Sequence, residues 1–272
     1  MFWVIQNNLF SEVNYNNLMI ALERFDIAHT VVKVVPIFNI LASHDFDSYS
    51  YNLPIDSSIE PFIDDSGLVM VCGSITLAKI GKERGWIPGS FLNDNFTFLK
   101  WREAYGKNLL NYESEIGELS KIKPKWDEFF IRPCEDTKEF SGMVMNRNQL
   151  YSSQNGIVIE GISYCNTDPI VMVSPIKEIY SEYRFFIVDS KVVAYSQYRL
   201  GDKIIQQSHV DKYIVDFAQQ MVNIWQPARA FVIDIALTPD GLKIIEINNI
   251  NSAGFYDCNI YKIVEAIENM TF

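Results

Sequence analysis

Apolar positions in the first hundred residues recur in short blocks whose spacing predicts strands and helices in turn. Three blocks rich in β-branched and other apolar residues predict buried strands, and two blocks with apolar residues at helical spacing predict helices. The predicted strands are residues 2–5, 29–36 and 68–72, and the predicted helices are residues 12–25 and 75–84. Because strands and helices alternate, we expect an α/β unit with parallel strand pairing over residues 1–95.

After residue 95 the pattern changes to closely spaced strands. Residues 96–119 are predicted to be mostly helical, and a helix is predicted over residues 210–225 and again at the C-terminus. Asp189 and Ser190 form a predicted tight hairpin turn. The predicted strands are residues 128–133, 142–145, 156–161, 170–174, 182–189, 191–199, 231–237 and 242–248. We therefore expect a largely antiparallel α+β domain over residues 96–272.

The composition fits a globular protein and argues against several classes of partner. Of the 272 residues, 48% are hydrophobic, so the chain can bury a core. The net charge of -11 argues against unspecific binding to nucleic acid or anionic lipid, which need a basic surface. Scattered cysteines and histidines indicate neither a disulfide framework nor a zinc site. With no signal-peptide pattern and no apolar stretch of membrane-spanning length, we expect a cytoplasmic protein.

The two closing strands carry polar residues within aliphatic runs. Glu246 and Asn248 stand two apart on one strand and therefore share a face. Asp234 on the preceding strand falls opposite Glu246 if the connection spans five residues, Thr238 to Leu242, whereas a four-residue connection turns it away. Acidic strands often face solvent, but these carboxylates are flanked by isoleucines, where an unpaired charge is costly. Two carboxylates and an amide on one face suit Mg²⁺.

Three basic residues on earlier segments are candidates to bind phosphate. Arg132 ends an apolar strand, Lys138 lies in the turn after it, and Arg184 lies among aromatic residues near the start of another strand. Separately, each is more readily explained as a surface residue or an ion-pair partner. Together with the acidic group, they form a set of charges suited to phosphoryl transfer.

Several well-known motifs are absent. The chain has no GxxxxGK[ST] loop and no GxGxxG fingerprint, which argues against a P-loop enzyme and a dinucleotide dehydrogenase. No grouping of serine or cysteine with histidine indicates a covalent nucleophile. The segment GSITL at residues 73–77 has two interpretations, an anion site at a helix N-terminus or a helix N-cap by Ser74.

The segments described above, in their order along the chain, resemble the ATP-grasp fold. The matching features are Arg132 with Lys138 and a following glycine, Arg184 within EYRFFIVD, and the ending IDIALTPDGLKIIEINN. They most resemble the phage-associated clade named for two arginines and one lysine. The resemblance covers about residues 96–272 and implies an ATP-grasp fold with antiparallel sheets. Residues 1–95 are similar to the α/β domain that precedes this fold in such enzymes.

The resemblance implies an ATP site between two β layers. Adenine is expected near the strand IVMVS, with hydrogen bonds from the backbone around Val173, Ser174 and Ile176. Glu178 and Glu182 are candidates to bind the ribose, although either is equally well explained as a solvent-facing charge.

The resemblance also implies roles for the charged residues. Arg132 and Lys138 are expected to hold the phosphates, and Arg184 is expected to face the transferred phosphoryl group or the acyl phosphate. The expected ligands of one or two Mg²⁺ ions are Asp234, Glu246 and Asn248, and the expected contacts of the second substrate are Arg199 and Ser252.

The function implied is an ATP- and Mg²⁺-dependent ligase. A substrate carboxylate would take the γ-phosphoryl group to give an acyl phosphate, and an amine would then displace phosphate to form an amide. Two alternatives remain open, a phosphotransferase that stops at a phosphorylated product and a non-catalytic nucleotide-binding or host-interaction protein. Residues 1–95 carry no pattern that identifies the carboxylate or amine, and the oligomeric state is not indicated.

Overall fold

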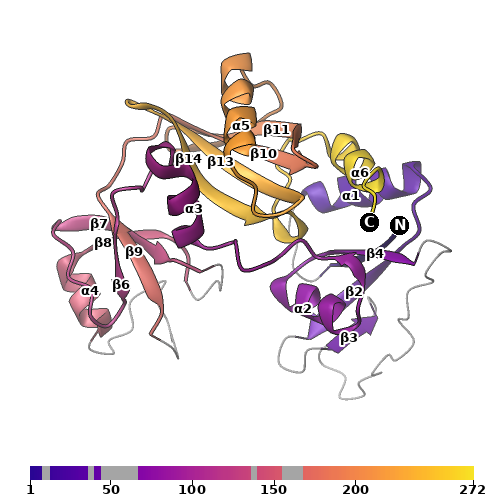
Figure 1. Ribbon diagram of the computed structural model, residues 1–272, viewed down its shortest axis with the longest axis horizontal. Helices are drawn as coiled ribbons and strands as arrows, with labels where there is room; N and C mark the ends of the chain where they lie inside the picture. Colours follow the sequence, from indigo (N-terminus) through magenta and orange to yellow (C-terminus); the bar gives the residue numbers. More distant parts are fainter. Residues whose placement is uncertain (8–12, 36–39, 44–66, 136–139, 155–167) are drawn as a thin grey trace.

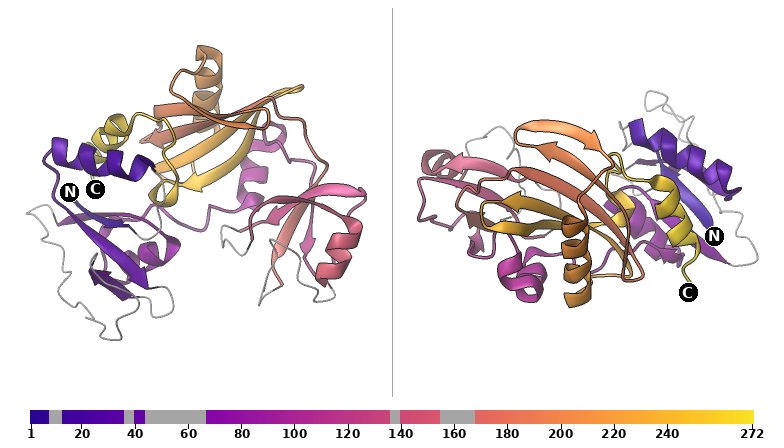
Figure 2. Two further views of the ribbon diagram at one scale, coloured as in Figure 1. Left: turned by 180° about the vertical axis from the view of Figure 1, so that it is seen from behind. Right: turned by 90° about the horizontal axis from the view of Figure 1, so that it is seen from above.

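The chain folds around three β-sheets that follow one another along the sequence. The computed structural model describes residues 1–7, 13–35, 40–43, 67–135, 140–154 and 168–272. A five-stranded sheet lies between an N-terminal unit and a four-stranded sheet (Figure 1). The same arrangement is seen from behind and from above (Figure 2). This confirms the expected combination of an α/β unit with antiparallel α+β layers.

The N-terminal sheet has the strand order β3-β2-β1-β4-β5. Strands β1, β2 and β4 pair in parallel, as predicted, whereas the strands β5, which pairs in parallel with β4, and β3, which adds an antiparallel edge, were not predicted. The Ser74 side chain caps helix α2 by accepting a hydrogen bond from the Leu77 amide, so the N-cap interpretation of GSITL is confirmed. The elements are β1 (Phe2–Gln6), α1 (Val13–Arg24), β2 (His29–Val35), β3 (Ile40–Ser43), β4 (Leu68–Cys72), α2 (Ile75–Glu83) and β5 (Ile87–Gly89).

The four-stranded antiparallel sheet has the order β6-β9-β7-β8. The prediction of a mostly helical segment over residues 96–119 is wrong beyond Tyr105. The helix ends where Gly106 takes a φ of 51°, and a short 3-10 turn and a strand follow. The predicted strand 156–161 lies outside the described residues. The elements are α3 (Phe98–Tyr105), η1 (Gly106–Asn108), β6 (Glu115–Glu118), β7 (Glu128–Pro133), β8 (Met143–Asn146), α4 (Arg147–Gln154) and β9 (Ile170–Ser174).

The five-stranded antiparallel sheet has the order β12-β11-β10-β13-β14. The predicted hairpin turn is confirmed, because Asp189 and Ser190 have φ angles of 42° and 68° and join β10 to β11. Strand β12 was not predicted. The elements are β10 (Ser181–Val188), β11 (Lys191–Leu200), β12 (Lys203–Gln207), α5 (Lys212–Ile224), β13 (Ala230–Thr238), β14 (Gly241–Asn249), η2 (Ile250–Ser252) and α6 (Ile260–Glu268).

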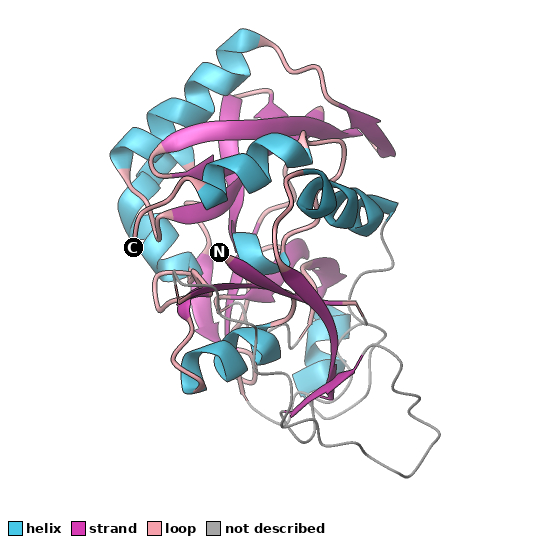
Figure 3. Cartoon of the chain, turned by 90° about the vertical axis from the view of Figure 1, so that its right-hand side faces the viewer, coloured by secondary structure: helices cyan, strands magenta, loops and turns pink. Residues whose placement is uncertain are grey.

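One hydrophobic core joins the N-terminal unit to the end of the chain. Trp3 and Leu18 are buried in the same cluster as Phe186 of β10 and Ile263 of α6. Helices α1 and α6 lie side by side, and the chain termini lie near each other (Figure 3). The indole of Trp3 donates a hydrogen bond to Glu268 at 2.6 Å. The core therefore crosses residue 95, and the division of the chain at that residue remains a prediction.

None of the helices in the described part of the chain has the length and apolar character needed to span a bilayer.

Candidate functional site

The hairpin β13–β14 places two carboxylates opposite each other through a bulge. The connection is shorter than either of the two lengths considered from the sequence, because Thr238 pairs directly with Gly241 and only Pro239 and Asp240 form the turn. On a regular ladder this turn would place Asp234 opposite Ile245. The register instead shifts between Ile235 and Asp234, so that Asp234 pairs with Glu246. The bulge restores the facing pair that the longer connection was expected to give.

Asp234, Glu246 and Asn248 converge on one face of the sheet. The Asn248 side-chain nitrogen donates to Glu246 Oε1 at 3.0 Å and to Asp234 Oδ2 at 3.3 Å. Asp234 is only 1% exposed, whereas Glu246 and Asn248 are partly open to a pocket. The amide therefore stands between two acidic groups, at a position where positive charge is favoured.

Arg184 is bound to Asp234 in a buried two-pronged ion pair. Its Nε donates to Asp234 Oδ1 at 2.8 Å, and its Nη2 donates to Oδ2 at 2.7 Å. Its third nitrogen donates to the Gly254 carbonyl at 3.0 Å. The guanidinium lies 4.7 Å from the ring centroid of Tyr256, which stacks on Tyr198. Arg184 is thus directed at the acidic group, and it does not line the pocket.

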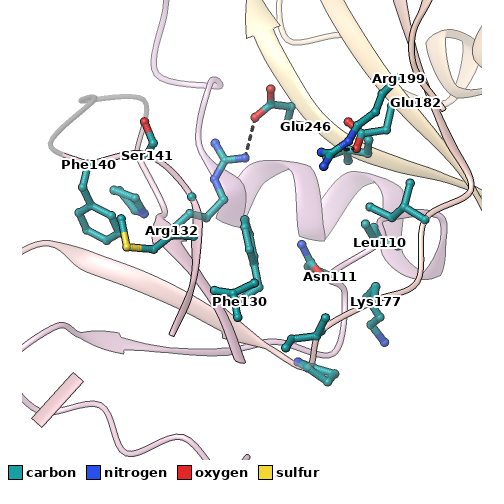
Figure 4. Close-up of a pocket in the computed structure, with 18 of the residues that line it drawn as sticks. Leu110, Asn111, Phe130, Arg132, Phe140, Ser141, Lys177, Glu182, Arg199 and Glu246 are labelled. Carbon is teal, nitrogen blue, oxygen red and sulfur yellow. Dashed lines mark hydrogen bonds and ion pairs between the residues drawn. The ribbon is translucent and has the colours of Figure 1, made fainter. Parts of the chain in front are cut away.

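Arg132 reaches the acidic group from the other sheet. It lies on β7, and its Nη1 donates to Glu246 Oε2 at 2.8 Å across the pocket (Figure 4). Its guanidinium lies 5.3 Å from the ring centroid of the buried Trp101 on α3, a cation–π contact that holds it in place. Lys138 lies outside the described residues.

The two carboxylates have opposite pKa shifts. Burial raises the pKa of Asp234 to about 7, and the neighbouring Glu246 adds to this rise while Arg184 opposes it. Burial also raises the pKa of Glu246, but Arg132 and the Asn248 amide outweigh burial and leave that pKa below its ordinary value. Glu246 is therefore the carboxylate that carries its charge on the pocket wall.

The pocket has a volume of about 820 Å³ and is lined by residues of the four-stranded and five-stranded sheets (Figure 4). Apolar side chains of its wall include Leu110, Phe130, Pro175 and Ile176. Charged side chains of the wall include Arg132, Lys177, Glu182, Arg199 and Glu246. Such a wall can hold a ligand that has both a flat apolar part and a charged part.

Some of the expected binding residues line the pocket and others do not. Glu182 is held by the Tyr198 hydroxyl at 2.6 Å and by Arg199 Nη1 at 3.1 Å. Val173 is buried between β6 and β7. The expected residues that line the pocket are Arg132, Ile176, Glu182, Arg199, Glu246 and Asn248, and the described ones outside its lining are Val173, Ser174, Glu178, Arg184, Asp234 and Ser252.

The polar lining residues that the prediction missed include Asn111 and Lys177. Lys177 directly follows the predicted adenine-binding segment, so its position in the sequence was a usable signal. Asn111 was missed because the segment 96–119 was predicted to be mostly helical, so no pocket-lining turn was expected there.

Comparison with family models identifies the protein family of this chain. A family model described as the ATP-grasp domain, family 3 of the clade named for two arginines and one lysine, matches residues 80–267. The chain belongs to this ATP-grasp family. The resemblance noted from the sequence is therefore confirmed, and the match begins inside helix α2, upstream of the expected boundary at residue 96. A comparison with curated proteins finds no match.

Solved ATP-grasp structures share the fold over nearly the whole chain. The D-cycloserine synthetase DcsG has a TM-score of 0.57 at 9% identity, with 98% of each chain covered. The D-alanine–D-alanine ligase of Bacillus anthracis has a TM-score of 0.58 at 10% identity, with 98% of this chain and 92% of that chain covered. The ATP-grasp ligase PsnB, solved with a minimal precursor, has a TM-score of 0.54 at 10% identity over 98% and 97% of the two chains.

The donor set of this ATP-grasp chain fits a divalent cation. Within the described residues no three His, Cys, Asp or Glu side chains form a metal cluster, and the side-chain oxygen nearest to Asp234 and Glu246 that could join them is that of the Asn248 amide. That oxygen becomes available if the amide turns, because its nitrogen now donates to both carboxylates. Two carboxylates and one amide, with water and phosphate oxygens completing the shell, suit Mg²⁺.

Proposed function

We propose that this protein is an ATP- and Mg²⁺-dependent ligase that joins a carboxylate to an amine through an acyl phosphate. The observation that carries the proposal is the contact between Arg132 and Glu246 across the pocket of an ATP-grasp chain. A cationic group that binds phosphate and an acidic group that binds metal thus face each other where a triphosphate would lie. Without nucleotide, Glu246 and Arg132 neutralise each other. With nucleotide bound, Arg132 would pair with phosphate oxygens and Glu246 with the metal ion.

The side chains have distinct proposed roles. Arg132, fixed against Trp101, binds phosphate oxygens, and Lys138 adds a second positive charge. Glu246 and Asn248 hold the metal from the pocket wall, with Asp234 behind them. When bound, Mg²⁺ would draw charge from the transferring phosphoryl group.

Arg184 has a proposed role that follows from its partners. Because its guanidinium holds both oxygens of Asp234, it fixes the direction of that carboxylate. It would face the transferred phosphoryl group only if the Asp234 pair loosens.

The other end of the pocket is proposed to hold the nucleoside. Ile176 and the backbone beside it would contact adenine, and Glu182 would accept hydrogen bonds from the ribose hydroxyls. Val173 and Ser174 would support this wall from behind, and Glu178 is exposed outside the pocket.

The second substrate is proposed to approach on the side of Arg199. This guanidinium lines the pocket and is partly exposed, so it can pair with a carboxylate. Ser252 in η2 is a second candidate for this contact. In-line transfer to a carboxylate needs orientation and charge stabilisation from the protein and no protein nucleophile. The names of the structural neighbours, which include ligases and a synthetase, support this reaction class.

The test is mass spectrometry of a cell extract incubated with the protein, ATP and Mg²⁺. The proposal predicts an amide condensation product that requires ATP and Mg²⁺ and that appears together with ADP. A phosphorylated product with no amine requirement would instead indicate a phosphotransferase. Binding of Mg-ATP without ADP release in any extract would indicate a non-catalytic nucleotide-binding protein.

A further inference from the structure

A pocket residue outside the expected set has one hydrogen-bonding group without a partner. Asn111 lies between η1 and β6, lines the pocket, and is only 6% exposed. Its Oδ1 accepts a hydrogen bond of 2.9 Å from the Ser174 hydroxyl. Its side-chain nitrogen has no hydrogen-bond partner among the described residues, and Figure 4 shows this nitrogen turned into the pocket.

The Ser174 hydroxyl fixes the orientation of the amide. Ser174 is fully buried at the end of β9, and within the described part of the chain its hydroxyl has Asn111 as its only partner. A buried hydroxyl that did not donate would leave its hydrogen unsatisfied, so it must donate, and the atom that accepts must be the amide oxygen. The nitrogen is consequently the atom offered to a ligand.

The surroundings of this nitrogen suit a flat heterocycle. Leu110 precedes Asn111, and Leu110 and Phe130 both line the pocket, as does the charged side chain of Lys177 (Figure 4). Pro175 and Ile176, which directly follow Ser174, also line the pocket. A buried donor with a fixed direction beside apolar side chains can orient a flat ligand and select for an acceptor in its ring.

We propose that Asn111 recognises the base of the nucleotide, by donating a hydrogen bond from its side-chain nitrogen to a ring nitrogen of adenine. Ser174 is the positioning residue that keeps the nitrogen directed at the base. This inference rests on the proposed function, since it requires ATP in the pocket. It adds a side-chain contact from outside the segment whose backbone was expected to bind adenine, and it predicts weaker binding of an ATP analogue that lacks the accepting ring nitrogen.

The test combines ligand analogues with variants of Asn111. Isothermal titration calorimetry would measure the affinity of the wild-type protein and of Asn111→Leu for ATP and for its 1-deaza, 3-deaza and 7-deaza analogues, with Mg²⁺ present. Each analogue replaces one ring nitrogen acceptor with a carbon. In the wild type, one analogue should bind about 10-fold more weakly than ATP, because the buried donor is left unpaired. In Asn111→Leu that penalty should disappear.

Further measurements separate base recognition from damage to the site. Inorganic tripolyphosphate, which has no base, should bind the wild type and Asn111→Leu equally. Ser174→Ala should reduce the penalty of the same analogue, because the amide is then free to rotate. Asn223→Leu, an equivalent change at an exposed position on α5, should leave all affinities unchanged.

The outcomes distinguish this inference from the proposed function. Equal analogue penalties in the wild type and Asn111→Leu would overturn base recognition by Asn111 while leaving ATP binding intact. Failure of the wild type to bind ATP at all would overturn both.

Discussion

Arg132 Nη1 and Glu246 Oε2, which come from different sheets, lie 2.8 Å apart, whereas Arg184 binds Asp234 with two hydrogen bonds within one sheet. Each acidic residue therefore has a basic partner on another strand. The two pairs differ in exposure, since the pair of Asp234 is buried and the pair of Glu246 faces the pocket. At the scale of the residue, we therefore expect the buried pair Arg184–Asp234 to stabilise the fold. The pair Arg132–Glu246 can be rearranged by a ligand in the pocket.

Glu246→Gln tests the metal assignment. The amide keeps the shape of the side chain and removes its charge, so Mg²⁺-dependent ADP release should fall on the order of 100-fold while the melting temperature changes little. Glu178→Gln, an equivalent change outside the pocket lining, serves as the control. Full activity in Glu246→Gln would remove Glu246 from the metal site.

Arg184→Ala tests the buried pair. Removing one partner leaves a buried charge uncompensated, so the free energy of unfolding should fall by about 3–5 kcal/mol. The matched control is Arg229→Ala, because Arg229 makes the same two-pronged contact with Asp189 on the surface. The loss there should be about 1 kcal/mol or less. Equal losses in urea denaturation would show that burial does not distinguish the two pairs.

Strand β14 shows what the sequence can and cannot predict about an element. The facing of Asp234 and Glu246 could be predicted, because alternation along each strand limits the possible partners. The length of the turn and the presence of a bulge could not be predicted, since a two-residue turn with a bulge and a five-residue connection give the same pairing of Asp234 with Glu246. Bulges depend on contacts with the neighbouring strands, which a single strand's sequence does not contain.

The 3-10 turn η2 after β14 is held to the N-terminal sheet by Asn251. This buried side chain accepts hydrogen bonds from the Phe91 amide at 2.9 Å and the Ser90 hydroxyl at 3.2 Å, and it donates to the Val71 carbonyl. It thereby joins the end of β14 to β4 and β5.

Asn251→Ala should therefore destabilise the protein by about 3 kcal/mol, because several buried partners lose their hydrogen bonds together. Asn259→Ala removes an exposed N-cap from α6 and should cost about 1 kcal/mol. Chemical denaturation of both variants measures the difference. A loss for Asn251→Ala no larger than that for Asn259→Ala would contradict a joining role.

At the scale of the whole molecule, the pocket exists because two separate sheets face each other. Most of the longer strands and the acidic hairpin could be predicted from local patterns. Asn111 and the Arg132–Glu246 contact depend on how the sheets are placed, with Arg132 and Glu246 114 residues apart in sequence. Local periodicity does not encode such placement, which explains why the site was predicted in part only.

The core shared by Trp3 and Ile263 predicts how the chain unfolds. Because helix α6 completes the N-terminal unit, both parts should lose structure together. Thermal unfolding followed by tryptophan fluorescence and by far-ultraviolet circular dichroism should give one coincident transition. Two separate transitions would indicate that the N-terminal unit folds independently of the end of the chain.

The most direct test of the central claim is a calorimetric titration of the protein with ATP, with and without Mg²⁺, repeated for Arg132→Ala. We predict saturable binding of one ATP per chain that is strengthened by Mg²⁺ and weakened at least ~10-fold in the variant, because the variant loses a charge-assisted contact to phosphate. An ATP affinity that changes neither on addition of Mg²⁺ nor in Arg132→Ala would contradict a nucleotide site between the two sheets.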